Sequence, residues 1–236
     1  MRAELVRGLT LPTTRALLVI VALLAIVPAA FAETTVTLAA SGAESSGQLP
    51  DTFGLSLSIT VFSALAALWR GCDLRSGELS VALLAVPSRT RLAVAEALAL
   101  GGLVATGAAA AFVVDRGVRS WIDPGSGPEA TEMWRTGTGF VIASVTVALL
   151  AATLVVLLRN AMLSIAVLLL LPLLVVPLLE RVAPPIAAAL PFSASGVVVA
   201  GSGSVPMSWT AGVAVLTVWA SASVGTALLL LHRRDL

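Results

Sequence analysis

The amino-acid sequence predicts an all-α membrane protein with six transmembrane helices in a single domain covering residues 1–236. Hydrophobic residues make up 58% of the chain and charged residues 11%, whereas soluble domains average about 45–50% and about 25%. Six segments approach the roughly 20 apolar residues that a helix needs to cross about 30 Å of hydrocarbon. These segments are residues 16–32, 53–69, 92–114, 138–158, 161–179 and 209–231.

The distribution of charge supports these spans and predicts their orientation. Five of the six contain no charged residue, and an arginine at a helix centre costs about 2.5–3.5 kcal/mol on insertion scales. With the N-terminus inside, ten of the 14 arginines lie on the cytoplasmic side and four lie outside. We therefore expect a multi-pass protein of the cell membrane with both termini in the cytoplasm. The absence of lysine beside abundant Ala, Val and Leu is typical of a bacterial genome rich in G and C.

The N-terminal region has two interpretations. Residues 2–14 mix apolar and charged side chains and are followed by the first span, which predicts an interfacial helix ended by Pro12; a disordered basic tail is the alternative. The apolar residues 17–27, with Ala-Phe-Ala before Glu33, also imitate a signal peptide. We favour an uncleaved span because the charged stretch before it is long and contains Glu4. Cleavage would leave five spans.

The third span carries two features that predict contacts. Small residues recur at every fourth position, a spacing that lets another helix approach closely; alanine-rich composition is the alternative explanation. Glu96 is the one acidic residue inside a span, and we expect it near the cytoplasmic interface, paired with an arginine. A proton relay through Glu96 is the alternative. The small residues are Ala93, Ala97, Gly101, Ala105 and Ala109, with Ala97, Gly101 and Ala105 as the predicted helix-packing site.

The segment between the fifth and sixth spans contains apolar pieces that are too short to cross a membrane. These pieces, residues 186–190 and 197–200, are interrupted by prolines and glycines. Such a pattern predicts a re-entrant segment, whose backbone polar groups must be covered by protein; a hydrophobic external loop is the alternative. The fourth and fifth spans are separated only by Arg159 and Asn160, which predicts a tight helical hairpin.

The residue inventory excludes several chemistries. Without lysine the chain cannot form the phosphate-binding motif GxxxxGK[ST] or a Schiff base. His232 and Cys72 are the only histidine and the only cysteine, so neither a Cys/His zinc site nor an intrachain disulfide can form. A Ser–His catalytic pair across the membrane is also excluded, because His232 lies at the membrane edge. We therefore expect no enzyme activity, no metal and no cofactor in this chain.

Residues 70–91 form a charged insert between two apolar spans. Ser76 is an expected N-cap, and Pro87 ends the expected helix. Between them, apolar residues spaced three and four positions apart predict a short amphipathic helix at the cytoplasmic surface. Its apolar face consists of Leu79, Ala82, Leu83 and Val86. A plain interfacial turn is the alternative.

The insert resembles a signature of the ABC-2 type transporter permeases. The pattern Asp73-x-x-x-Gly77-x-Leu79, followed by Leu84-x-x-Pro87-x-Arg89, is similar to their acidic-xxx-Gly-Thr-Leu…Leu-x-x-Pro-x-Arg sequence. The likeness extends to the N-terminal stretch, the six spans, residues 189–196 and the basic ending 232–236. Three positions depart from the family pattern: Asp73 replaces a glutamate, Glu78 a threonine, and Glu96 a basic residue. The resemblance implies an ATPase-coupling helix with the residues Asp73, Gly77, Glu78, Leu79, Leu83, Leu84, Pro87 and Arg89.

The resemblance implies a transmembrane permease subunit of an ABC exporter. ATP and Mg²⁺ would be bound by a separate cytoplasmic ATPase, present in two copies, and the permease would pair with an identical or related protomer in the lipid bilayer. No nucleic-acid partner is expected. A non-transporting membrane anchor or assembly subunit is one alternative, and a secondary transporter relying on Glu96 is another. The cargo stays open among drugs, lipids, peptides and glycans.

Overall fold

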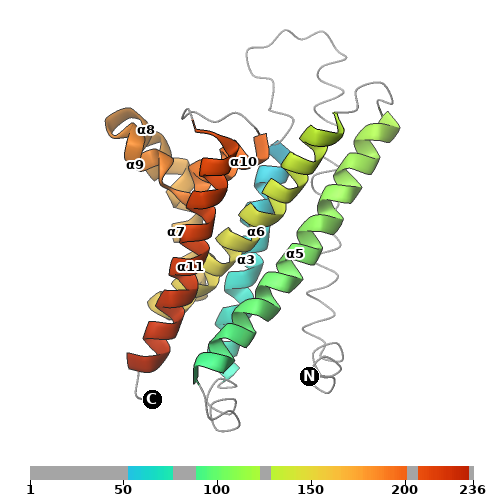
Figure 1. Ribbon diagram of the computed structural model, residues 1–236. Helices are drawn as coiled ribbons and strands as arrows, with labels where there is room; N and C mark the ends of the chain where they lie inside the picture. The colour runs from blue at the N-terminus through green and yellow to red at the C-terminus, as the bar shows by residue number, and fades with distance from the viewer. Residues whose placement is uncertain (1–52, 77–88, 123–128, 201–206, 234–236) are drawn as a thin grey trace.

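The computed structural model describes residues 53–76, 89–122, 129–200 and 207–233, and these residues are helical apart from short connections. Figure 1 shows the long helices side by side, with α7 to α9 diverging from the rest at one end of the bundle. The elements in chain order are α3 (Phe53–Ser76), α5 (Arg89–Ile122), α6 (Ala130–Leu158), α7 (Ala161–Leu170), the π-helical turn η1 (Leu171–Val175), α8 (Val176–Val182), α9 (Pro184–Ala188), α10 (Pro191–Ala200) and α11 (Trp209–Arg233).

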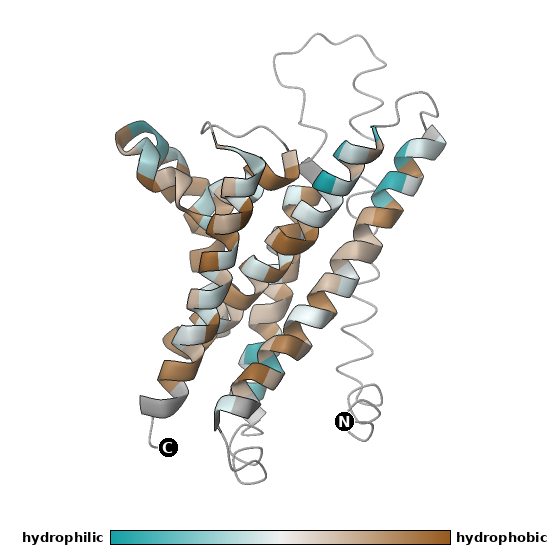
Figure 2. Ribbon diagram, viewed as in Figure 1, coloured by the Kyte–Doolittle hydropathy of each residue, from teal (hydrophilic) through white to brown (hydrophobic). Residues whose placement is uncertain are grey.

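Five helices among the described residues are long and apolar enough to cross a membrane, as in a multi-pass membrane protein. Each coincides with an expected span, and Figure 2 shows their middles to be mainly hydrophobic. The expected span at residues 16–32 and the expected interfacial stretch at residues 2–14 lie outside the described residues. The five helical stretches are Leu55–Asp73, Ala93–Trp121, Ala130–Leu158, Ala161–Val182 and Trp209–Leu230.

α6 is the central helix of the described bundle, because it packs against α3, α5, α7, α10 and α11. Its buried side chains are mostly small or β-branched, which lets the neighbouring helices approach closely. Phe140 is the largest of them and is completely buried. The face also contains Ala143, Val147, Ala151 and Val155, all fully buried.

Several helices extend beyond the expected spans. α3 extends beyond residue 69 through Asp73 to Ser76, while the short helix that Ser76 was expected to cap lies outside the described residues. α5 continues past residue 114 to Ile122, and α6 begins at Ala130 instead of residue 138. A span predicted from hydropathy ends where charged residues begin. The α-helix itself can continue further, because it depends on backbone hydrogen bonds and not on hydropathy.

The hairpin between α6 and α7 has the expected two-residue connection. Arg159 adopts a left-handed conformation with φ 53° and ends α6. Asn160 then caps α7, because its Oδ1 accepts hydrogen bonds from the backbone N–H groups of Met162 (3.0 Å) and Leu163 (3.3 Å). The next span continues from α7 through η1 into α8 rather than as one α-helix. Pro172, which lacks a backbone N–H, lies in the π-helical turn.

The segment expected to be re-entrant forms two short helices. Prolines begin both of them, since Pro184 is the first residue of α9 and Pro191 the first of α10. From the sequence these prolines were expected only to interrupt the apolar pieces, although proline is also well suited to the first position of a helix. The ten residues of α10 span about 15 Å, roughly half of a hydrocarbon core. Six of them are buried: Pro191, Ala194, Ser195, Val197, Val198 and Val199.

Two glycines hold α10 between α6 and α11. A Cβ added to Gly139 of α6 would overlap the backbone and side chain of Val198 on α10. A Cβ added to Gly212 of α11 would lie 2.6 Å from Cγ2 of the same valine. Only glycine permits the close approach of the two backbones at Gly139.

Candidate functional site

An ion pair joins α3 to α5 at the end of the bundle where α3 ends and α5 begins, which we call the Arg70 end. Nη2 of Arg70 lies 2.8 Å from Oε2 of Glu96, and Nη1 lies 3.8 Å from Oδ2 of Asp73. The Arg70 side chain is 13% exposed and that of Glu96 is 33% exposed. The predicted pairing of Glu96 with an arginine is confirmed.

The ion pair borders a cavity of about 150 Å³ that lies between four helices. Apart from the ion pair and Asp73, the lining is mainly aliphatic, with Trp69 as its aromatic residue. The lining residues are Ala66, Trp69, Arg70 and Asp73 of α3; Ala93, Glu96, Ala97, Ala99 and Leu100 of α5; Leu149, Ala152, Thr153 and Val156 of α6; and Val224 and Ala227 of α11.

The wall formed by α6 and α11 is fixed by Thr153. Its hydroxyl donates hydrogen bonds to the carbonyl oxygens of Leu149 (2.9 Å) within α6 and of Ser223 (3.2 Å) on α11. A hydroxyl that would otherwise be buried without a partner is thereby satisfied. The cavity therefore has one side held by an ion pair and another held by a hydrogen bond between helices.

Two of the eight predicted ATPase-coupling residues, Asp73 and Arg89, lie among the described residues. Asp73 lies near the end of α3, one turn after Arg70, and Arg89 is the first residue of α5. The structure therefore places the two ends of the predicted coupling segment on the two helices that the Arg70–Glu96 pair connects. The other predicted residues lie outside the described residues; they are Gly77, Glu78, Leu79, Leu83, Leu84 and Pro87.

The predicted small-residue row on α5 winds around the helix. Ala93 is buried and Ala97 lines the cavity, whereas Ala109 is exposed. A Cβ on Gly101 would lie 3.6 Å from Val145 of α6, and Ala105 is half-buried. Steps of four residues advance about 40° beyond a full turn, so the row drifts away from any one neighbour. The packing role of Ala97, Gly101 and Ala105 stays a prediction.

Toward the other end of the bundle, the buried residues of α5 are instead spaced three or four positions apart. This spacing follows the helical period and keeps the same face toward α6. These residues are Val104, Ala108, Ala111 and Asp115.

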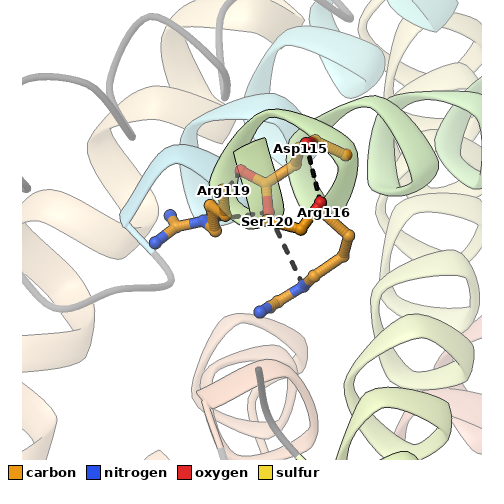
Figure 3. Close-up of polar contacts among 5 residues, drawn as sticks. Asp115, Arg116, Arg119 and Ser120 are labelled. Carbon is orange, nitrogen blue, oxygen red and sulfur yellow. Dashed lines mark hydrogen bonds and ion pairs between the residues drawn. The ribbon is translucent and has the colours of Figure 1, made fainter. Parts of the chain in front are cut away.

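An ionic cluster surrounds Asp115, which lies just beyond the expected span at residues 92–114 and was not among the predicted site residues. Figure 3 shows the Asp115 carboxylate between the side chains of Arg116 and Arg119 on the extended part of α5. The carboxylate is fully buried and accepts from Nε of Arg119 at 3.2 and 3.3 Å. Nε of Arg116 lies 3.7 Å from Oδ2, and its guanidinium is 5.2 Å from the centre of the Phe112 ring. The i, i+4 spacing of Asp115 and Arg119, typical of helical ion pairs, was the available signal.

The described residues carry two ionic clusters, one around Arg70 and one around Asp115. They contain no group of three or more His, Cys, Asp or Glu side chains that could hold a metal ion. No family model, curated protein or solved structure matches the chain. The Arg70 end combines an ion pair, an adjacent cavity and the flanks of the predicted coupling segment, and is the candidate functional site.

Proposed function

We propose that this chain is the membrane-spanning permease subunit of an ATP-binding cassette exporter, driven by a separate ATP-binding subunit. The main support is the position of the signature that resembles the ABC-2 permeases. Its first residue, Asp73, is on α3 and its last, Arg89, begins α5. The ion pair between Arg70 and Glu96 connects the same two helices beside that segment.

This arrangement supports a mechanical role for the segment between α3 and α5. A cytoplasmic ATPase that moved the segment would pull on both helices, and the ion pair would keep them together. The cavity borders both helices as well as α6 and α11, so such a movement would change its shape. ATP and Mg²⁺ would be bound by the partner subunit, because the chain lacks the lysine of a phosphate-binding loop.

In this proposal the Arg70 end faces the cytoplasm, as the arginine distribution predicts. The α10 helix lies toward the opposite end of the bundle (Figure 1). In this proposal it would be a re-entrant segment that enters the outer leaflet. Its burial against α6 and α11 supports this assignment, since re-entrant backbone must be covered by protein. The expected span at residues 16–32 would complete six spans, and two protomers would enclose the path for cargo.

The pairing of Glu96 weakens the secondary-transporter alternative. That alternative requires an intramembrane carboxylate available to carry a proton or an ion. Glu96 instead lies 2.8 Å from a guanidinium on a neighbouring helix, an arrangement that supports a structural role.

The proposal is tested by purifying the tagged chain from its native membranes in a mild detergent. We expect a protein with a GxxxxGK[ST] motif to copurify, with ATPase activity that vanadate inhibits. Leu79→Asp with Leu83→Asp should abolish the copurification, because aspartate cannot be buried in an apolar contact without a large cost. Val81→Asp is the matched control, since residue 81 is opposite the predicted docking face. Stable wild-type protein without any such ATPase would refute the proposal and favour a membrane anchor.

A further inference from the structure

We propose that the cavity at the Arg70 end binds a small organic monocation with an apolar body of about one aromatic ring. The binding site itself needs only residues of this chain. Its role as the cytoplasmic entry site for cargo rests on the proposed export function.

The size of the cavity limits the ligand. Its volume is about 150 Å³, and an apolar cavity of about this volume is known to hold a benzene molecule. The Arg70 cavity therefore suits a single ring, and it is too small for a sugar chain or a folded peptide. It is bounded by side chains from four helices, which is typical of ligand sites between the helices of bundles.

The distribution of polarity sets the orientation of the ligand. Glu96 is one helical turn closer to the Arg70 end than Leu100, and Arg70 is one turn closer than Ala66. Leu149 is likewise further from this end than Val156, because α6 ends there. All six residues line the cavity. Its charged groups therefore lie toward the Arg70 end, and an aliphatic part formed by Ala66, Leu100 and Leu149 lies further from that end, which suits a ligand with a polar head and an apolar body.

The charges favour a cationic head. Arg70 already lies 2.8 Å from the Glu96 carboxylate and 3.8 Å from that of Asp73, so an anion would compete with two carboxylates for one guanidinium. A cation would instead meet the Glu96 side chain, which is 33% exposed. Trp69 also lines the cavity, and an indole ring attracts quaternary ammonium groups through its π-face.

The first test compares three probes on the purified wild-type chain in lipid nanodiscs. Phenyltrimethylammonium has the proposed charge and size, tert-butylbenzene has the same shape without charge, and benzenesulfonate is an anion of similar size. Isothermal titration should show saturable binding of the cation that is at least tenfold tighter than that of either other probe. Absence of saturable cation binding would overturn the proposal, and so would equal or tighter binding of the neutral or the anionic probe.

Variants then locate the site. Ala152→Leu adds bulk to the cavity wall and should weaken phenyltrimethylammonium binding at least tenfold. Ala166→Leu, at an exposed position on α7, is the matched control and should bind as the wild type does. Glu96→Gln should remove the preference for the cation over tert-butylbenzene while leaving affinity for the neutral probe unchanged. Unaltered cation binding by Ala152→Leu would place the site elsewhere and refute the assignment.

The binding and copurification results are separable. Cation binding without an associated ATPase would keep the site and refute the export function. An associated ATPase without cation binding would keep the export function and refute the site.

Discussion

Trp219 on α11 donates a hydrogen bond from Nε1 to the carbonyl oxygen of Ala189, over a distance of 2.8 Å. Ala189 lies in the connection between α9 and α10, 30 residues earlier in the chain. The bond therefore fixes the entry to α10 against the last long helix. Its position explains a tryptophan far from the ends of α11, where an interfacial anchor would be expected.

Trp219→Phe should loosen this connection. The substitution removes the donor but keeps an aromatic ring, so we expect a loss of about 0.5–1.5 kcal/mol, the usual contribution of one hydrogen bond. Thermal unfolding in detergent measures the loss, and hydrogen exchange should be faster in residues 186–192. Trp209→Phe is the control, because Nε1 of Trp209 has no hydrogen-bond partner among the described residues. An equal loss in both variants would show that ring size, rather than the bond, is responsible.

The ion pair between Arg70 and Glu96 should appear as a coupling between two substitutions. Arg70→Gln and Glu96→Gln should each cost about 1.5–3 kcal/mol, as expected for hydrogen bonds to charged groups. The double variant should cost clearly less than the sum, because the second substitution removes no further pair. Arg135→Gln, at an exposed position on α6, should change stability by less than about 0.5 kcal/mol. Strict additivity in chemical denaturation would contradict the pairing.

Two glycine substitutions should have opposite effects. Gly139→Ala should destabilise the chain by about 1–3 kcal/mol, since the new methyl group overlaps Val198. Gly102→Ala should stabilise α5 by up to about 1 kcal/mol, because nothing lies within 4 Å of the added carbon and alanine favours a helix. Midpoints of unfolding for the two purified variants give the comparison. Similar effects in both would mean that α10 does not approach α6 as described.

Asp115→Asn should be among the most damaging single substitutions near the ends of the helices. It removes the buried carboxylate that pairs with Arg116 and Arg119, whose side chains are 22% and 18% exposed. Breaking a buried pair by removing one partner typically costs about 3–5 kcal/mol. Glu132→Gln, at an exposed site on α6, is the control and should be nearly neutral. Loss of folded protein on size exclusion for the first variant alone would agree with this expectation; equal stability of both would contradict it.

The transmembrane helices were predictable because burying a charge in hydrocarbon is costly, so each spanning segment is almost free of charged residues along its whole length. Residues 138–158 and 209–231 could therefore be located from composition alone. The ends of α3 and α5 were not predictable in this way, because Asp73 and Asp115 look like loop residues until their ion pairs with nearby arginines are known. Burial of Asp115 depends on three-dimensional packing that no hydropathy average contains.

The candidate site was predictable in part. The position of Glu96 near the end of a span predicted an arginine partner, but the sequence offered several arginines and gave no means of selecting Arg70. The cavity was not predicted, since its wall combines residues as distant as Ala66 and Ala227. The small-residue row does not follow one neighbouring helix along its whole length, because a repeat of four does not match the period of the helix.

The two glycines beside Val198 have a consequence for movement. Gly139 of α6 lies against the backbone of Val198 on α10, and Gly212 of α11 lies against the side chain of the same valine, so sliding between these helices would bring atoms into overlap. The three helices are closely packed, and Thr153 adds a hydrogen bond between α6 and α11. A change in the shape of the Arg70 cavity is then expected to come mainly from α3 and α5, which form its other walls, moving against these three helices.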